Sequence, residues 1–201
     1  MHMIGIISTM RLPEPFDRLE DRAIRVLSVG RDDTVFRRDD PTVAIYFVEA
    51  GRVELRRYLP SGALAVLHRA GPGDFFAEAA LFSVSYHCDA VASKDSRLFR
   101  IARAALLDRM GNDAQFCFEL CGRFARQVQA YRRKVEILAI ESAEDRVYAA
   151  FAEGLMGGSI KSFAGEIGLS HEAVYRALAG LARKGLVLKT GRGMFALPEP
   201  K

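Results

Sequence analysis

The sequence predicts an α+β fold with an antiparallel β-roll, or jelly roll, at the N-terminal end, a long dimerisation helix, and a winged helix-turn-helix at the C-terminal end. Three observations predict this order. Short β-type runs separated by turn residues occupy residues 33–101, an uninterrupted amphipathic stretch occupies residues 113–140, and two short helical runs followed by a hairpin occupy residues 161–197. The chain has 201 residues, 50% of them hydrophobic, which is enough to bury a core in each of two domains. We expect the β-roll domain over residues 1–110, the long helix over 111–140 and the winged helix-turn-helix domain over 141–201.

The N-terminal half is expected to begin with a helical lead-in over residues 1–30, because apolar residues such as Phe16 and Ala23 recur there with loose helical spacing. The strands of the roll are expected over residues 34–36, 43–49, 52–58, 63–68, 86–92 and 96–101. Turn residues, including Gly51 and the pair Lys94-Asp95, are expected to separate these strands.

The middle of the chain carries a heptad pattern. Its apolar residues are spaced alternately four and three apart, and they are Cys117, Cys121, Phe124, Val128, Tyr131, Val135 and Leu138. Such a seam is better explained by a second helix than by one-sided packing, so we expect a parallel homodimer. The alternative is a helix that lies only on its own roll. Ser142 is placed to cap a further helix, which predicts a hinge there, and Gly157-Gly158-Ser159 is expected to end that helix.

The last part of the chain predicts a helix-turn-helix. An apolar run stops at Gly168, which can adopt the positive φ of a tight turn, and Ser170 is placed to cap the next helix. The N-terminal end of such a second helix enters the major groove, and the hairpin that follows is expected to act as a wing. The residues expected to contact DNA are Ser170, His171, Glu172, Tyr175, Arg176, Lys189 and, at the wing tip, Arg192. The alternatives are a small α+β domain without DNA contacts and, for Arg176, a phosphate contact or a salt bridge that only holds Glu172.

Two segments of the chain resemble one known family. The run GEIGLSHEAVYRALAGLARKGLV, residues 165–187, resembles the DNA-binding end of the cyclic-AMP receptor protein and fumarate-nitrate regulator (Crp/Fnr) family. Residues 46–82, YFVEAGRVELRRYLPSGALAVLHRAGPGDFFAEAALF, look like the cyclic-nucleotide-binding roll of the same family. The resemblance implies a transcription regulator whose partners are double-stranded DNA, a second copy of the chain and RNA polymerase. It also implies that Glu172 and Arg176 specify neighbouring G·C pairs in a palindromic operator with half-sites ~10 base pairs apart.

The nucleotide pocket that this resemblance implies is altered in the sequence. Glu78 is kept, but Ala77 stands at the position of a ribose-binding glycine, Cys88 at that of the phosphate-binding arginine and Asp89 at that of a serine or threonine. Because a buried phosphodiester needs a charge-assisted fork and Asp89 would place like charge against it, we expect the effector to be something other than cyclic AMP. A constitutive or cyclic-nucleotide-controlled regulator of the same family is the alternative. Haem is not expected, since the ligand positions of haem-binding relatives fall on Ser83 and Ser85.

The three cysteines are the candidate effector site. Cys117 and Cys121 lie one helical turn apart, and Cys88 belongs to a pocket that, by the resemblance, packs against the same helix. We expect the three thiols to converge, and soft thiolates would select Cu(I) or Zn(II), or else respond to oxidation. The alternative is that these cysteines are small apolar core residues.

Composition excludes several other classes. No apolar run is long enough to span a bilayer and the first residues lack a basic secretion signal, so a cytoplasmic protein without membrane contact is expected. An enzyme is not expected, because the histidines are scattered and neither a glycine-rich phosphate loop nor a nucleophile-elbow motif is present. The net charge of +4 favours nucleic acid only mildly. A β-roll module that binds something other than DNA remains a further alternative.

Overall fold

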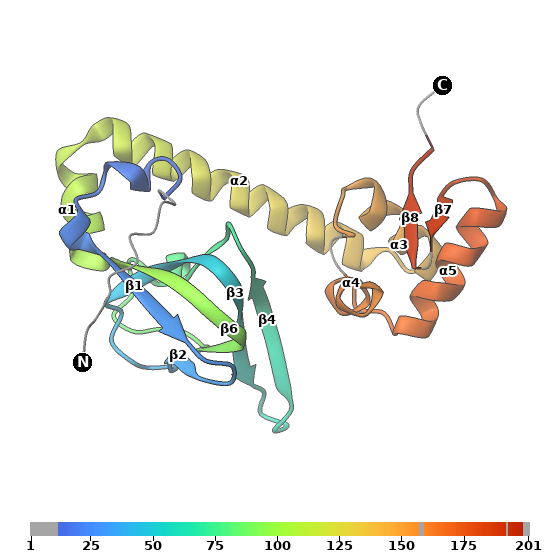
Figure 1. Cartoon of the computed structure of the whole chain (residues 1–201), viewed down its shortest axis with the longest axis horizontal. Coiled ribbons are helices and arrows are strands. Elements are labelled where there is room, and N and C mark those ends of the chain that lie inside the picture. Colours follow the sequence, from blue (N-terminus) through green and yellow to red (C-terminus); the bar gives the residue numbers. More distant parts are fainter. Residues whose placement is uncertain (1–11, 157–158, 192, 199–201) are drawn as a thin grey trace. The chain divides into compact units, whose positions relative to one another are not determined.

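The computed structural model describes residues 12–156, 159–191 and 193–198, and it confirms the predicted α+β fold (Figure 1). Contacts divide the chain into two compact units, Met1–Gly122 and Arg123–Lys201, which are described separately. The first unit contains the roll, the second contains the helix-turn-helix, and the long helix contributes to both. This division falls inside the long helix, whereas the sequence suggested boundaries at its two ends.

The elements of the two units follow one another simply along the chain. The described part of the N-terminal unit contains η1 (Phe16–Arg18), η2 (Asp21–Ala23), β1 (Ile24–Val29), β2 (Thr34–Phe36), β3 (Ala44–Tyr58), β4 (Leu64–Ala70), β5 (Phe75–Phe76), η3 (Glu78–Ala80), β6 (Asp89–Ala102), α1 (Arg103–Asn112) and the start of α2 (Ala114–Ala139). The described part of the C-terminal unit contains the rest of α2, α3 (Ala143–Ala152), α4 (Ile160–Glu166), α5 (His171–Arg183), β7 (Leu188–Gly191) and β8 (Met194–Ala196). None of the described helices combines the length and the apolar composition that crossing a bilayer requires.

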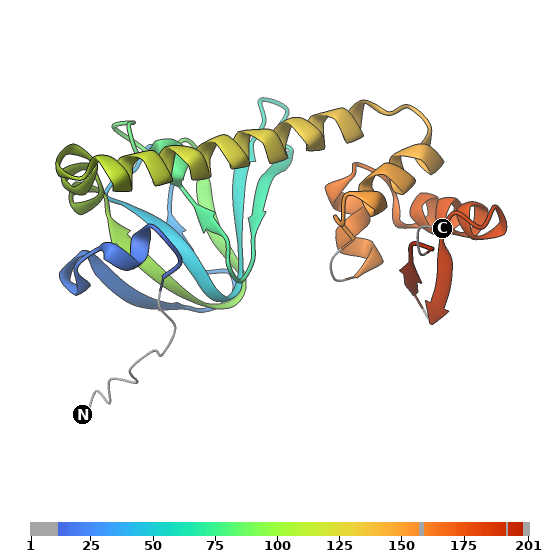
Figure 2. The ribbon, with the colours of Figure 1, turned by 90° about the horizontal axis from the view of Figure 1, so that it is seen from above.

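One antiparallel sheet forms the roll, with the strand order β1-β6-β3-β4, while β2 pairs with β6 and β5 with β3. The two longest strands, β3 and β6, are central to it, and Ile45 lies opposite Ile101 in their ladder. The sheet curls around a core that includes Val48, Phe76 and Leu98 (Figures 1 and 2). The predicted roll is therefore confirmed.

Two of the predicted strand breaks are bulges inside continuous strands. β3 runs through Gly51, which has φ +92°, and the register with β6 shifts between Ala50 and Arg52. A β-carbon on Gly51 would lie 2.5 Å from Cα of Ser96, so only glycine fits where the two strands approach. Lys94-Asp95, the second predicted break, likewise lies within β6. Because a bulge bends its strand and increases the local twist, this pair of irregularities helps to curl the sheet.

The predicted helical lead-in is wrong where the structure describes it, and residues 1–11 of it lie outside the described residues. Residues 16–23 form two short 3-10 turns, and β1 begins at Ile24, which pairs with Ile101. Phe16 is buried, stacks on Phe75 with ring centroids 4.2 Å apart, and meets Phe116 of α2 edge-on at 6.4 Å. The spacing of the apolar residues in this segment is therefore explained by their packing against β5 and α2, and not by a helical period.

The long helix α2 confirms the uninterrupted helix predicted from the sequence. Its first turn is capped by Asp113, whose Oδ1 accepts from the backbone N–H of Phe116 at 2.9 Å. Phe116 and Leu120 are fully buried in the N-terminal unit. In the C-terminal unit, Ile137 is buried in the core around α3, α4 and α5, while Val135 is 65% exposed. The heptad seam thus has an exposed face that its own chain leaves uncovered.

In the C-terminal unit, α3 begins after Ser142 as predicted, because the Ser142 hydroxyl accepts from the N–H of Asp145 at 3.3 Å. The helix ends at Ala152, before the predicted Gly157-Gly158-Ser159, and Gly154 then takes φ +71°. Residues 157 and 158 lie outside the described residues. The hairpin of β7 and β8 lies beside α5 in both ribbon views (Figures 1 and 2).

Candidate nucleic-acid interface and effector pocket

Helix α5 presents the side chains predicted to read DNA. It begins after Ser170, whose Oγ accepts from the N–H of Ala173 at 3.1 Å, and Gly168 makes the preceding turn with φ +65°. Val174, Ala177, Leu178 and Leu181 are buried on the opposite face. The exposed side chains at the start of the helix are His171, Glu172, Tyr175 and Arg176. The structure thus brings these four predicted residues onto one surface, and their contact with DNA stays a prediction.

His171 contacts two of the other side chains, Glu172 and Tyr175. Nδ1 of His171 lies 3.5 Å from Oε1 of Glu172, and the His171 ring meets the Tyr175 ring edge-on with centroids 4.8 Å apart. The pKa of Glu172 is lowered, first by its own backbone N–H and then by Ser170 and His171. Because its pKa lies below the ordinary range, Glu172 is a charged hydrogen-bond acceptor at neutral pH.

Arg176 follows Glu172 by one helical turn and is exposed. It forms no ion pair with any residue that the structure describes, and Glu172 pairs with His171 instead. The salt bridge to Glu172, one of the alternatives for Arg176, is therefore not formed in this structure. A guanidinium without an internal partner offers all five N–H donors to a ligand.

The wing is formed by β7 and β8, with Leu188 opposite Ala196. Lys189 is exposed on β7, and Arg192, predicted at the wing tip, lies outside the described residues. At the turn, a β-carbon on Gly193 would lie 3.9 Å from the hydroxyl oxygen of Tyr175. The hydroxyl of Tyr175 therefore lies near the wing turn, a relationship that sequence spacing did not indicate.

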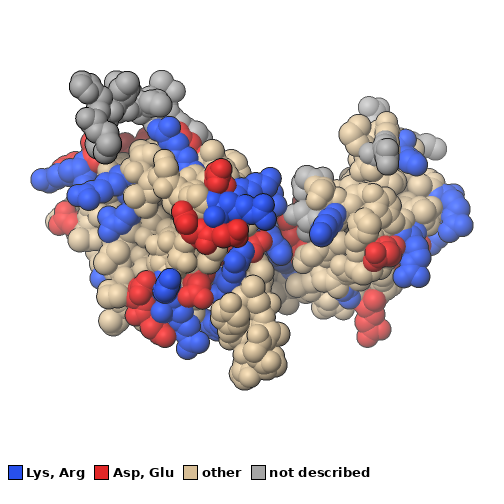
Figure 3. Space-filling view, turned by 60° about the horizontal axis from the view of Figure 1, so that its bottom comes forward, with Lys and Arg blue, Asp and Glu red and all other residues tan. Residues whose placement is uncertain are grey.

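The charge on the C-terminal unit is mixed. On the face drawn in Figure 3, its Lys and Arg side chains are interspersed with acidic side chains and uncharged surface rather than forming one continuous patch. Contact with a polyanion would then depend on individually placed side chains more than on a broad positive field.

The residues predicted to form the effector pocket lie at η3 and at the start of β6. Ala77, which stands at the glycine position, adopts the left-handed φ of +67° directly before Glu78. Cys88 is 8% exposed, and burial raises the pKa of its thiol. The charge of Arg57 lowers that pKa, while Asp89 and Glu78 raise it further. Glu78 and Asp89 are thus near enough to Cys88 to raise the pKa of its thiol.

Sequence reasoning missed Arg57, which reaches this pocket from β3. Its Nη2 donates to the carbonyl oxygen of His87 at 2.8 Å. The neighbouring Arg56 lies opposite Asp89 in the ladder of β3 and β6, so cross-strand register brings Arg57 to the pocket. Asp89 itself accepts from the backbone N–H of Arg38 at 2.8 Å. Only the register could have indicated Arg57, because it lies far from Cys88 in the sequence.

The predicted convergence of Cys88, Cys117 and Cys121 is wrong for the described residues of one chain. No three His, Cys, Asp or Glu side chains among them are close enough together to hold a metal ion. Burial and then the neighbouring Cys121 raise the pKa of Cys117, whereas Cys88 is buried in the roll. Because Phe116 and Leu120 face the core of the N-terminal unit, the cysteines that follow each of them are turned about 100° away from it.

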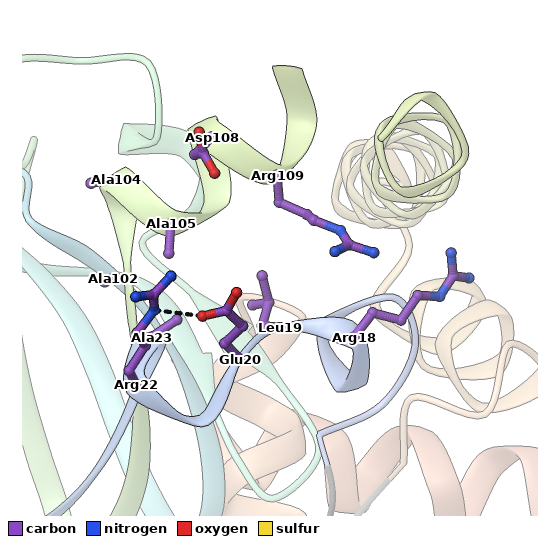
Figure 4. Close-up of a pocket in the computed structure, with 10 residues that line it drawn as sticks. All are labelled: Arg18, Leu19, Glu20, Arg22, Ala23, Ala102, Ala104, Ala105, Asp108 and Arg109. Carbon is purple, nitrogen blue, oxygen red and sulfur yellow. Dashed lines mark ion pairs between the residues drawn. The ribbon is translucent and has the colours of Figure 1, made fainter. Parts of the chain in front are cut away.

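A cavity of about 340 Å³ between the N-terminal segment and α1 was not indicated by the sequence (Figure 4). It is lined by Arg18, Leu19, Glu20, Arg22, Ala23, Ala102, Ala104, Ala105, Asp108 and Arg109. Its arginines are paired with acids: Arg22 with Glu20 at 2.5 Å, Arg109 with Asp113 at 2.6 Å, and Arg18 with Glu119. This pairing leaves little net charge to attract an anion.

Comparison with known proteins agrees with this arrangement. Residues 26–113 match the family model of the cyclic nucleotide-binding domain. The chain is 29% identical over 173 residues to a cyclic AMP receptor protein of Thermus thermophilus, across 82% of this chain and 80% of that protein. It is 27% identical over 181 residues to the transcriptional regulator LdrP, also of Thermus thermophilus, across 84% of this chain and 90% of LdrP. Over more than four fifths of its length, the chain is therefore similar to transcription regulators of the Crp/Fnr family.

The fold of the chain also matches solved structures. FixK2 from Bradyrhizobium japonicum superposes with a TM-score of 0.66 at 23% identity, across 87% of this chain and 92% of FixK2. Coverage of this extent requires both units to be matched, because neither unit alone is that long. The winged helix-turn-helix and the roll are therefore shared parts of the fold.

Proposed function

We propose that this regulator binds a specific duplex DNA sequence, and the observation that carries the proposal is Arg176. Its exposed guanidinium has no ion-pair partner among the described residues and lies one turn after the charged Glu172. Arginine pairs bidentately with O6 and N7 of guanine, and glutamate accepts from N4 of cytosine. The two side chains would therefore specify neighbouring G·C pairs in each half-site. Bound there, the protein would alter transcription by RNA polymerase.

The regulator would act as a homodimer. The exposed apolar residues of α2 that support this are Val128, Tyr131, Val135 and Leu138, which continue the heptad pattern of Cys121. A second copy of the same helix, packed in parallel, would cover them. Because a two-fold dimer reads two equivalent half-sites, the operator would be a palindrome with half-sites ~10 base pairs apart.

The effector would not be cyclic AMP. Cys88 is a buried thiol whose raised pKa keeps it neutral, so it cannot replace a phosphate-binding arginine. Asp89 and Glu78 add carboxylates to the same pocket. A phosphodiester placed there would meet like charge, which disfavours its burial.

One observation favours a second candidate, an anionic effector that includes cyclic nucleotides. Nε of Arg57 is buried and has no hydrogen-bond partner among the described residues, although Nη2 of the same side chain is engaged by His87. Calorimetric titration with cyclic AMP separates the candidates. Absence of binding by the parent protein supports a different effector, whereas micromolar binding that is lost in Arg57→Ala favours the second candidate.

Selection from randomised duplex DNA tests the main proposal. The parent protein is expected to enrich a palindrome, and Arg176→Ala is expected to lose the preference at one G·C pair of each half-site while the other positions are kept. Arg133→Ala, on the exposed part of α2, is the control and should enrich the parental sequence. If the parent enriches no sequence, a role as a non-DNA interaction module is favoured instead.

Sedimentation of the Val135→Glu variant tests the helix pairing. This variant is expected to be monomeric where the parent is dimeric.

A further inference from the structure

An open groove of about 600 Å³ lies where α1 meets the start of α2. Three sulfur-containing side chains line it: Met110 from the last turn of α1, and Cys117 and Cys121 from consecutive turns of α2. The other lining residues carry no charge, and they are Gly111, Asn112, Ala114 and Phe118. The groove therefore presents soft donor atoms without competing carboxylates or imidazoles.

The two thiols of the groove come from consecutive turns of one helix. Cys117 and Cys121 are four residues apart and both line the groove, so their side chains lie on one face of the helix. Cys121 is exposed in the single chain, so a small ion can reach the pair before a second α2 covers this end of the seam. Cys88, the third cysteine, is buried in the roll and takes no part in this group.

We propose that Cys117, Cys121 and Met110 form a binding site for Cu(I). Thiolate and thioether sulfur are soft ligands that select Cu(I). A structural Zn(II) site needs four ligands, whereas this groove offers only three sulfur ligands. Binding breaks the S–H bonds of the two cysteines and forms two S–Cu bonds, and two protons pass to solvent. The thioether of Met110 completes the site without a change of charge, and no electron is transferred.

The consequence for regulation rests on the proposed homodimer, although the metal site itself does not. Cys121 belongs to the same heptad seam as Val128 and Val135. An ion held beside Cys121 would change how the two α2 helices meet at this end of the seam. If the ion binds one arrangement of the two helices more tightly than another, it shifts the protein toward that arrangement. Such a difference in affinity is required for the ion to change DNA affinity.

Anaerobic titration of the reduced full-length protein with Cu(I), in competition with the chromophoric chelator bicinchoninate, tests the site. The parent is expected to withdraw one Cu(I) per chain, with a near-ultraviolet thiolate-to-copper absorption. Cys117→Ser and Cys121→Ser should each lose this competition, and Met110→Leu should weaken binding by about tenfold or more. Cys88→Ser is the matched control and should bind as the parent does. X-ray absorption at the copper edge should show sulfur neighbours alone.

The proposal is overturned if the parent leaves all Cu(I) with the chelator, if Cys88→Ser loses as much binding as Cys121→Ser, or if nitrogen or oxygen neighbours dominate the absorption spectrum. Should Cys117→Ser not fold, the exposed Cys121 still provides the test. DNA binding of the metal-free protein is measured separately. Copper binding without any DNA binding would contradict only the proposed regulator, and DNA binding without copper binding would contradict only the metal site.

Discussion

Arg146 of α3 donates from Nε to the carbonyl oxygen of Ile140 at 2.8 Å, across the segment that joins α2 to α3. Its Nη2 reaches the same oxygen at 2.5 Å, and Nη1 reaches the carbonyl oxygen of Ile167, before the turn into α5, at 3.4 Å. One side chain thus joins the end of the long helix to the turn of the helix-turn-helix. The sequence predicts a hinge at Ser142, and in the structure this segment is bridged within the C-terminal unit.

Replacing Arg146 should therefore destabilise the C-terminal unit. We expect Arg146→Ala to lower the free energy of unfolding by about 1–3 kcal/mol, because the carbonyl oxygens of Ile140 and Ile167 lose their donor. Arg133→Ala is the control, since its ion pair with Glu153 at 3.5 Å is half exposed and should contribute less than about 1 kcal/mol. Urea denaturation followed by circular dichroism measures both. Equal losses would mean that the bridge contributes no more than a surface ion pair.

The bulge at Gly51 should be more sensitive to substitution than an open turn. We expect Gly51→Ala to cost more than Gly62→Ala, because both positions have a positive φ but only Gly51 faces backbone atoms that a β-carbon would strike. The left-handed conformation alone costs about 1–2 kcal/mol, which sets the expected loss for Gly62→Ala. Thermal unfolding of the two variants compares them. A Gly51→Ala protein as stable as Gly62→Ala would show that the strands can separate to make room.

The same glycine explains where sequence reasoning about the fold succeeded and failed. Apolar alternation correctly located the strands on both sides of Gly51, and the spacing of the later helices was correct as well. Glycine, however, signals a positive φ without saying whether a turn or a bulge uses it. The distinction depends on Asp95 and Ser96 of the partner strand, which are distant in the sequence.

The candidate sites show a similar division. The helix cap at Ser170 and the exposed group around Arg176 followed from local spacing, which one helix fixes by itself. The place of Arg57 in the pocket depended on strand register, and the separation of Cys88 from Cys121 depended on which face of α2 packs in the N-terminal unit. Neither the strand register nor the packing face of α2 can be read from a short stretch of sequence.

Two carboxylates at the start of α2 should make the stability of the N-terminal unit depend on acid pH. The pKa of Glu119 is lowered by its hydrogen bond from Arg18, and the pKa of Asp113 is lowered by the backbone N–H of Phe116. A carboxyl whose pKa is lower in the folded state binds fewer protons there than in the unfolded state. Its stabilisation is complete above the unfolded pKa and is lost as the pH falls through the folded pKa.

We therefore expect the free energy of unfolding to fall between about pH 5 and pH 3. Arg18→Ala should flatten this dependence, because the pKa of Glu119 then returns toward its ordinary value. Arg22→Ala, which removes an exposed ion pair with Glu20, is the control. Urea denaturation across this pH range measures the slopes. An Arg18→Ala protein with the parental slope would contradict the role given to the Arg18–Glu119 pair.

The wing should contribute to DNA affinity through its charge, without adding a preference for particular base pairs. Lys189 is exposed on β7, beside the turn that Tyr175 approaches, and it would contact phosphate. We expect Lys189→Ala to weaken binding to all sequences alike and to lower the slope of log affinity against log salt by about one. The same is expected for Arg192→Ala. Arg176→Ala should instead cost about 1–3 kcal/mol against the preferred site, with little change for a scrambled duplex.

Fluorescence anisotropy with the selected operator and with a scrambled duplex, at several salt concentrations, separates these two roles. A phosphate contact changes both affinities by the same factor, because every duplex carries the same backbone charge, whereas a base contact changes their ratio. The decisive quantity for Lys189→Ala is therefore the ratio of specific to non-specific affinity, which should equal the parental one. If Lys189→Ala lowers that ratio as much as Arg176→Ala does, the wing takes part in base readout and the specificity assigned to α5 alone is wrong.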